Sequence, residues 1–374
     1  MDFLLSPLIP LCGLFLLRTS AIQASLIALG LASVLLSPFS FPLSHFPFPM
    51  LLFLLLALVA ANLLFGSVSL PMSEVIAALM GDEAPEAVRI IVCESRLPEV
   101  VVGILAGGSL AMAGLVMQTV FSNPLADPSL LGVNAGASLG VAVAILFCGG
   151  ALTAGTLTVS GYLLILLLAF IGATLVIVMI TLCSALMRSR LHLLVTGVMF
   201  RFVLSSLISI LNFFAGADGI RSYVVWGMGT FSAVGMDRLP LFSITILCGI
   251  IALFLLLKPL NALLLGEAYA ASLGVRVTLS RTLLLGVVGL LTAIVTAFCG
   301  PISFIGLAVP HAVRWLHRSS DHRKLMPSCF LGGAIVALLC NLLAHITTSA
   351  GLLPINTLTP LLGVPIVLLL LSKG

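Results

Sequence analysis

Long, uninterrupted apolar runs recur along the chain from about residue 50 to its C-terminal end. Of its 374 residues, 61% are hydrophobic and only 7% are charged, whereas a soluble domain carries roughly a quarter charged residues. A bilayer accommodates such runs, because a helix of about 20 apolar residues spans the hydrocarbon layer and satisfies its own backbone groups. The runs lack the alternation of membrane β-barrel strands. The sequence therefore predicts an all-α, polytopic transmembrane helical bundle.

Ten of these runs lie in the expected main domain, residues 49–374. The predicted spans are 50–66, 97–121, 129–148, 157–182, 193–215, 239–257, 282–299, 302–317, 327–346 and 354–372. Residues 1–48 form an apolar extension, in which segments 3–17 and 21–36 flank Arg18. The extension lacks the basic start and the small-residue cleavage site of a signal peptide. We expect it to form a hairpin of two extra membrane helices, or one helix and an interfacial segment.

The charged residues divide the chain into one acidic and several basic regions. Between Val68 and Glu99, six carboxylates accompany only two arginines. Three basic clusters occur elsewhere: Arg188 and Arg190; Lys258, Arg276 and Arg281; and Arg314, Arg318, Arg323 and Lys324. Basic loops stay in the cytoplasm, so we expect these clusters on the cytoplasmic side and the acidic stretch outside. The net charge of +4 comes without a basic patch interleaved with aromatics, so nucleic acid is not an expected partner.

Neither a metal site nor a catalytic site is expected from the sequence. The eight cysteines are scattered singly without a CxxC pair, and we interpret them as packing residues. His311, His317 and His322 share no helix face with a carboxylate at metal-ligand spacing. The chain has no GxxxxGKS/T phosphate loop and no clustered nucleophile and base. We therefore predict a protein that is not an enzyme and that holds no cofactor itself.

Glycines recur at helical spacing in two places. Gly103 and Gly107 are four residues apart, and Gly132, Gly136 and Gly140 repeat that interval. Small residues at this spacing let helix backbones approach closely in lipid. We interpret both sets as packing positions.

A proline pair interrupts the sequence between the second and third predicted spans. The segment reads Asn123-Pro124-Leu125-Ala126-Asp127-Pro128. Irregular backbone at membrane depth is tolerated where it is buried in protein or lines a water-filled path, which suits a gate. Asn and Asp are also common in helix-capping turns, and Asp127 is placed to cap the next helix. The residues alone leave both interpretations open.

Two further segments lie on the expected cytoplasmic side. Residues 260–275 read as short helices broken at Gly266 and Gly274. Such a segment can lie on the lipid, dock into a groove of a partner, or form an ordinary interfacial loop. The segment 300–314 contains Pro310-His311, and we interpret this histidine as a packing residue.

Together these segments resemble the permease family of ATP-binding-cassette importers for cobalamin, haem and ferric siderophores. The strings, in order over about residues 50–374, are RLP, NPLADPSLLGVNAGASLG, LGEAYAASLGV, GPISFIGLAVPHAVR with SDHRKLMP, and LPINTLTPLLGVPI. The resemblance implies ten helices per subunit and a homodimer around a central pathway in the lipid of the bacterial inner membrane. It also implies two ATPase subunits, which bind the ATP, and a periplasmic or lipid-anchored substrate-binding protein.

The resemblance also assigns roles to three groups of residues. It implies an ATPase-coupling loop comprising Leu265, Gly266, Glu267, Ala268, Leu273, Gly274 and Val275. It implies a cytoplasmic gate at Asn123, Leu125 and Leu194. It further implies that Arg96 pairs with a carboxylate of the binding protein, and we expect an exposed arginine suited to a charge-assisted bond.

Two departures from the family pattern alter the expected docking face. Glu99 stands where a second arginine often follows RLP, and His345 stands where the family often has an arginine after Asp-x-x-Ala. Both are further docking candidates. We therefore expect the charges at the contact between this chain and its binding protein to differ from those usual in the family.

The sequence leaves two functions to compare. The first is the permease subunit of an ATP-driven importer that moves a bulky iron chelate, haem or cobalamin by alternating access. The alternative is an ion-coupled secondary transporter, which usually needs a carboxylate or histidine pair inside the membrane. Only Arg201 and His345 fall well within predicted spans, and no acid does. This pattern favours the importer, whose substrate the sequence does not specify.

Overall fold

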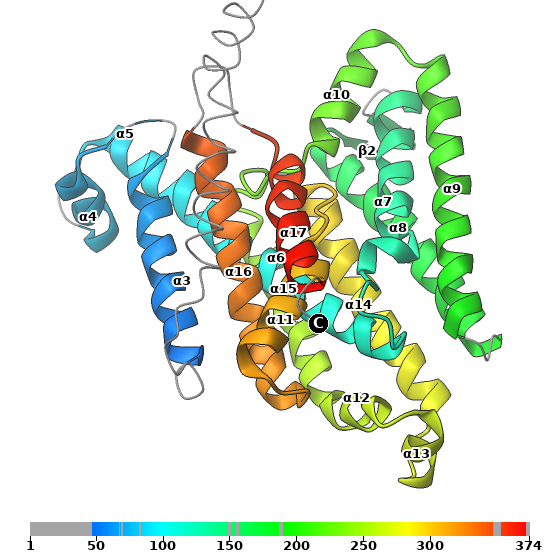
Figure 1. The fold of residues 1–374 in the computed structure, drawn as a ribbon. Coiled ribbons are helices and arrows are strands. Elements are labelled where there is room, and N and C mark those ends of the chain that lie inside the picture. The colour runs from blue at the N-terminus through cyan, green and yellow to red at the C-terminus, as the bar shows by residue number, and fades with distance from the viewer. Residues whose placement is uncertain are drawn as a thin grey trace, which may run out of the picture.

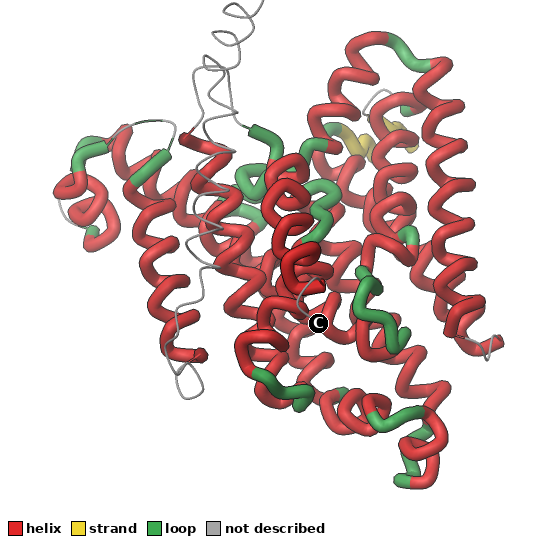
Figure 2. The backbone as a smooth tube through the Cα atoms, viewed as in Figure 1, coloured by secondary structure: helices red, strands yellow, loops and turns green. Residues whose placement is uncertain are grey.

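Helices form nearly all of the chain that the computed structural model describes (Figures 1 and 2). The described residues are 47–371 except 67, 69, 82–83, 149–150, 155–156, 187–189 and 347–352. The predicted N-terminal hairpin, with segments 3–17 and 21–36, lies outside them. The all-α class is confirmed, with one short β-hairpin added to it.

The helical elements lie in the following order along the chain. They are α3 (Pro47–Leu64), α4 (Met72–Met80), α5 (Glu86–Arg89), the π-helix η2 (Ile90–Arg96), α6 (Leu97–Val120), the 3-10 helix η3 (Pro128–Leu131), α7 (Val133–Ala142), the π-helix η4 (Val143–Phe147), α8 (Tyr162–Leu186), α9 (Arg190–Phe214), α10 (Ala217–Gly227), α11 (Leu239–Leu255), α12 (Leu257–Leu264), α13 (Glu267–Ser272), α14 (Val277–Cys299), α15 (Ile305–His317), α16 (His322–Ile346) and α17 (Ile355–Leu371).

Each of the ten predicted spans overlaps a helical element, but one begins too early. Residues Leu157–Ser160 form strand β2, which pairs antiparallel with β1 (Ala151–Ala154). Gly161 follows with φ +61°, and α8 begins only at Tyr162. The predicted span 157–182 therefore includes the second strand of a hairpin, which its threonine and valine favour.

Five helical stretches in the described part of the chain are long and apolar enough to cross a membrane: Glu86–Val120, Leu163–Ile180, Val195–Phe214, Val277–Cys299 and His322–His345. The pair α11 and α12, bent by 52°, makes a sixth if it counts as one span. The apolar helices Phe48–Leu64 and Val133–Phe147 are shorter. Several membrane-spanning helices are thus confirmed, and the number of ten crossings stays a prediction.

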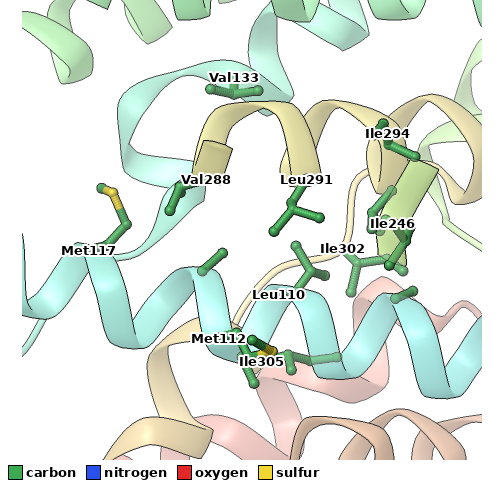
Figure 3. Packing of buried hydrophobic residues seen from close by; sticks show 14 of the residues in the cluster. Leu110, Met112, Met117, Val133, Ile246, Val288, Leu291, Ile294, Ile302 and Ile305 are labelled. Atoms are coloured by element: carbon green, nitrogen blue, oxygen red, sulfur yellow. The ribbon is translucent and has the colours of Figure 1, made fainter. Parts of the chain in front are cut away.

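The core is built around α6. Leu110, Met112 and Met117 of this helix pack against side chains of α14, α11 and α15 (Figure 3), among them Leu291 and Ile246. In the stretch Glu86–Val120, 89% of the apolar window is buried. This helix is therefore the central element of the described core.

Glycines let the central helices touch, as the spacing predicts. A Cβ added to Gly107 would lie 2.3 Å from the carbonyl oxygen of Gly333 on α16. A Cβ added to Gly136 would lie 2.5 Å from that of Gly172 on α8. Neither position has room for a side chain, because backbones make the contact. The packing interpretation of these glycines is confirmed.

Helix α9 behaves differently from the central helices. Only 6% of its apolar window, Val195–Phe214, is buried. It stands at one side of the molecule in Figure 1, and large apolar side chains such as Phe202 and Phe213 are exposed on it. A face of this kind must be covered by lipid or by another protein.

The elements that carry the basic clusters lie at one end of the molecule. Helices α12 and α13 stand at the bottom of the view in Figure 1, α10 stands at the top, and α5 and α4 lie at the left in its upper half. We call these the α13 end and the α10 end. Helices α4 and α5, which carry Glu74 and Glu86, thus lie away from α12, which carries Lys258. The side of the membrane that each end faces stays a prediction.

Candidate functional site

The turn between α6 and η3, residues 121–127, is built from short side-chain caps. Ser122 has φ +46°, and the amide of Asn123 bonds back to the carbonyl of Gln118 at 3.1 Å. The Oδ1 atom of Asn123 accepts from the amide of Leu125 at 2.9 Å. Leu125 itself is 48% exposed. The candidate gate residues Asn123 and Leu125 therefore lie on an ordered turn with an apolar side chain at its surface.

Asp127 ends this turn and caps the next helix. Its Oδ1 accepts from the amide of Ser129 at 2.8 Å, which confirms the capping interpretation. The side chain is buried. Burial raises the pKa of the Asp127 carboxyl above its usual value, and the bonds from Ser129 oppose part of that rise. The turn thus holds a carboxyl group in a place where its charge is costly.

Helix α15 fastens the same turn from the side. Nε2 of His311 donates to the carbonyl of Pro124 at 2.7 Å. The guanidinium of Arg314 donates to Oε1 of Gln118 on α6, and Nε2 of Gln118 donates to the carbonyl of Leu307 at 3.2 Å. His311 is therefore a structural hydrogen-bond donor. No group of three metal-ligating side chains occurs among the described residues.

The α12–α13 segment, residues 257–275, is two short helices joined and ended by glycines. Gly266 has φ +100° and Gly274 has φ +81°, a region that favours glycine. No atom lies within 4 Å of a Cβ added to either, so backbone conformation alone requires glycine at these positions. The prediction of short helices broken at these two residues is confirmed.

The segment exposes apolar side chains at the α13 end of the molecule. Leu265, Tyr269 and Leu273 are 64%, 52% and 58% exposed. On its inner side, Glu267 lies 3.7 Å from the guanidinium of Arg281 on α14. The segment is therefore anchored on one face and leaves an apolar surface on the other.

The third candidate gate residue belongs to another element. Leu194 lies near the N-terminal end of α9. Its side chain is outside the part of the chain that the structure describes. Its role as a gate residue stays a prediction.

The expected exposure of Arg96 is wrong. Its side chain is only 6% exposed, and its guanidinium donates to the carbonyls of Leu63 at 2.7 Å, Leu64 at 2.9 Å and Val68 at 2.5 Å. The arginine thus caps the C-terminal end of α3, where free carbonyls and the helix dipole favour a cation. In this structure its donors are used inside the chain.

Glu99 and His345 form a second internal contact near the α10 end. Both side chains are largely buried, and Nε2 of His345 lies 3.6 Å from Oε2 of Glu99. Nδ1 of His345 donates to the carbonyl of Asn341 at 2.9 Å. A pocket of about 220 Å³ beside the pair is lined by both side chains, by residues at and after the end of α10, and by residues at the end of α16 and the start of α17. Docking roles for Arg96, Glu99 and His345 stay predictions.

Two features escaped the sequence reasoning. One is the buried Glu99–His345 pair: Glu99 lies inside the predicted span 97–121, where no acid was expected. The other is a polar junction in which Thr119, Asn261 and His322 meet from three helices. The residues of each contact lie far apart in the sequence, so no local pattern predicts either contact. The polar type of each residue inside an otherwise apolar region was the only available signal.

Comparisons with known proteins agree with this arrangement. The model of the FecCD transport family matches residues 54–373. The chain is 35% identical over 290 residues to the vitamin B12 import system permease protein of Klebsiella pneumoniae, covering 76% of this chain and 84% of that protein. The corresponding protein of Salmonella typhimurium is 35% identical over 294 residues, covering 79% and 87%.

A solved structure has the same fold. It is described as a metal-chelate type ABC transporter in an inward-facing conformation. The two chains share 28% sequence identity with a TM-score of 0.76, and the match covers 87% of this chain and 98% of that one.

Proposed function

The chain belongs to the FecCD transport family and is a membrane permease of an ATP-binding-cassette importer, and from this premise we propose how it works and what it carries. It moves a bulky metal chelate or corrinoid across the bacterial inner membrane by alternating access. Candidate substrates are cobalamin, haem and ferric siderophores. The partner ATPase subunits bind the ATP, and this chain performs no covalent chemistry.

The α12–α13 segment carries this proposal. It offers exposed apolar side chains at the α13 end, and Glu267 and Arg281 hold it against α14. A short helix presented in this way suits docking into a groove of a partner. We propose that Leu265–Ala268 and Leu273–Val275 contact the ATPase, and that Asn123, Leu125 and Leu194 form the cytoplasmic gate.

Helix α9 supports the homodimer. Its apolar window is hardly covered within one protomer, and α9 also carries serines at residues 205, 206 and 209. Small polar residues are common at helix interfaces in membranes. A second copy of the chain that packs against α9 would enclose a pathway between the two subunits.

The ion-coupled alternative now has one observation in its favour, the buried Glu99–His345 pair. The pair lies near the α10 end of α6 and α16, and Arg96 lies three residues before Glu99. A coupling ion would be expected near the middle of the membrane. The position of the pair and the family membership favour the ATP-driven importer.

Site-directed cross-linking tests the proposed ATPase contact. Leu273 on the α12–α13 segment and Met80 at the end of α4 are both exposed apolar residues. Leu273→Cys should cross-link to the partner ATPase, and the matched variant Met80→Cys should not. Cross-linking through Met80→Cys alone would overturn the assignment of the ATPase contact to the α13 end.

The substrate is tested by uptake into proteoliposomes that contain the permease, its ATPase and its binding protein. Cyanocobalamin, haemin and ferrichrome are offered in turn with ATP. We expect ATP-dependent uptake of one of the three. If all three fail while the complex hydrolyses ATP normally, the proposed substrate class is wrong.

A further inference from the structure

A buried polar junction connects three helices at the α13 end. Thr119 lies at the C-terminal end of α6, Asn261 lies on α12, and His322 begins α16. His322 is 1% exposed and Thr119 is 4% exposed. Buried polar side chains in an apolar bundle are retained where they hold specific partners.

The hydrogen-bond pattern fixes the orientation of each group. Nδ2 of Asn261 donates to Oδ1 of Asp321 at 2.9 Å. Bonds to the Arg323 amide and to Asn261 lower the pKa of the Asp321 carboxyl, so this group accepts. The Oδ1 atom of Asn261 must therefore face His322, and it accepts from the backbone amide at 3.0 Å and from Nδ1 at 2.7 Å.

The other ring nitrogen of His322 reaches α6. Because Nδ1 carries the ring proton and donates to Oδ1 of Asn261, Nε2 of the neutral ring accepts from the hydroxyl of Thr119, 2.8 Å away. The carbonyl of Leu115 in the same helix, 3.0 Å from the hydroxyl, is a second acceptor that shares its single proton. The imidazole is thus a rigid bridge between α12 and α6, with one nitrogen committed to each.

One end of this bridge lies in the proposed ATPase-coupling segment, and the other lies beside the candidate gate. Asn261 is on the first helix of the α12–α13 segment, whose Leu260 and Leu263 are buried against the core. Thr119 is four residues before Asn123, and the turn that follows is fastened to α15 by His311. Asn261, His322 and Thr119 therefore connect α12 to the candidate gate through a short chain of hydrogen bonds.

We propose that His322 is a positioning residue that transmits movement of the α12–α13 segment to the α6–η3 turn through Asn261 and Thr119. The inference rests on the proposed function, because it assumes that the ATPase moves this segment. A rigid hydrogen-bonded bridge transmits a shift that apolar contacts alone would absorb by sliding. Its loss should uncouple ATP hydrolysis from gate movement while leaving the fold intact.

The test uses Thr119→Val, which removes the hydroxyl and nearly keeps the volume. Thr292→Val is the matched control, because Thr292 is also buried and its hydroxyl bonds to the carbonyl of Val288 in its own helix at 2.8 Å. Thr119→Ser keeps a hydroxyl and should restore coupling. The readout is ATP hydrolysed per molecule of cyanocobalamin, haemin or ferrichrome taken up, whichever the wild-type proteoliposomes transport.

We expect Thr119→Val to raise this ratio by about fivefold, the change in an equilibrium that one buried hydrogen bond supports. Thr292→Val and Thr119→Ser should keep the wild-type ratio. Thr119→Val leaves Nε2 of His322 without its donor and should lower the thermal midpoint modestly, so the ratio is measured at a temperature well below every midpoint. His322→Asn keeps a donor toward Asn261 but has no atom at the position of Nε2. Combined with Thr119→Val, it should leave the ratio of ATP hydrolysed to substrate taken up at the value of Thr119→Val alone.

Three results would contradict the inference. The first is a wild-type ratio in Thr119→Val. The second is an equal rise in Thr119→Val and Thr292→Val, which would mean that loss of any buried hydroxyl has this effect. The third is absence of ATP-dependent uptake by the wild-type complex, which overturns the proposed function and this inference with it.

Discussion

Gly266 and Gly274 shape the α12–α13 segment at the scale of single residues. Both have positive φ and open space around the position of a Cβ. Substitution by alanine there introduces backbone strain without a steric clash, so that its effect reports on the conformation of the segment.

Gly274→Ala should weaken stimulation of the partner ATPase, because a left-handed alanine costs roughly 1–2 kcal/mol. Gly286→Ala is the matched control: Gly286 lies inside α14, has no positive φ and also has open space for a Cβ. That change should preserve or slightly raise stability, since alanine favours a helix over glycine by about 1 kcal/mol. Equal ATPase stimulation in both variants would contradict the assigned role of the segment.

Asp127 predicts a pH dependence of stability. Burial raises the pKa of its carboxyl in the folded state, so the folded chain binds a proton more tightly than the unfolded chain does. The contribution of this group to the free energy of unfolding therefore falls as pH rises from the ordinary aspartate pKa of about 3.9 through the higher folded value.

Asp127→Asn removes this titration and keeps an oxygen that accepts from Ser129. The variant should be more stable than the wild type at pH 7, and the difference should shrink as pH falls toward about 4. Thermal unfolding in detergent across that range measures it. A stability difference that stays constant with pH would show that the Asp127 carboxyl does not titrate as described.

At the scale of elements, the contacts between helices determine what the sequence could and could not predict. The predicted spans 282–299 and 327–346 begin just after charged residues. Helix α14 starts five residues before the predicted span, because Arg281 is buried beside Glu267. Helix α16 likewise starts at His322, whose ring is satisfied by α6 and α12. Partners from distant segments lower the cost of burying these polar residues, and no local sequence pattern reveals those partners.

The candidate site divides in the same way. The glycine breaks of the α12–α13 segment and the Asp127 cap follow from local chemistry. The sequence predicted the glycine breaks and offered the cap as one of two interpretations. The burial of Arg96 was missed because its acceptors belong to α3, about thirty residues earlier. The Glu99–His345 contact joins α6 to α16, 246 positions apart.

The Glu99–His345 contact makes a prediction about the packing of α6 on α16. Breaking a buried pair leaves one group uncompensated, at a cost of about 3 kcal/mol, whereas replacing both partners by apolar residues is often close to neutral. His345→Leu should therefore lower the thermal midpoint more than Glu99→Leu combined with His345→Leu. If the double variant loses the sum of the two single losses, the pair does not interact.

At the scale of the whole molecule, α9 predicts where two copies meet. Val203 and Ile210 are exposed, lie seven residues apart and share one helix face. In a background without the native cysteines, Val203→Cys and Ile210→Cys should each form disulfide-linked dimers. Leu56→Cys on α3, which is similarly exposed, should not. Cross-linking through α3 alone would place the dimer on another face.

The energy source of transport tests the central claim most directly. The permease is reconstituted with its ATPase and binding protein, and uptake of cyanocobalamin, haemin and ferrichrome is measured with ATP, without ATP, and with an imposed proton gradient. We predict uptake that requires ATP and the ATPase and that survives collapse of the gradient. Uptake by the permease alone that stops when the proton gradient collapses would contradict this account and favour ion-coupled transport through the Glu99–His345 pair.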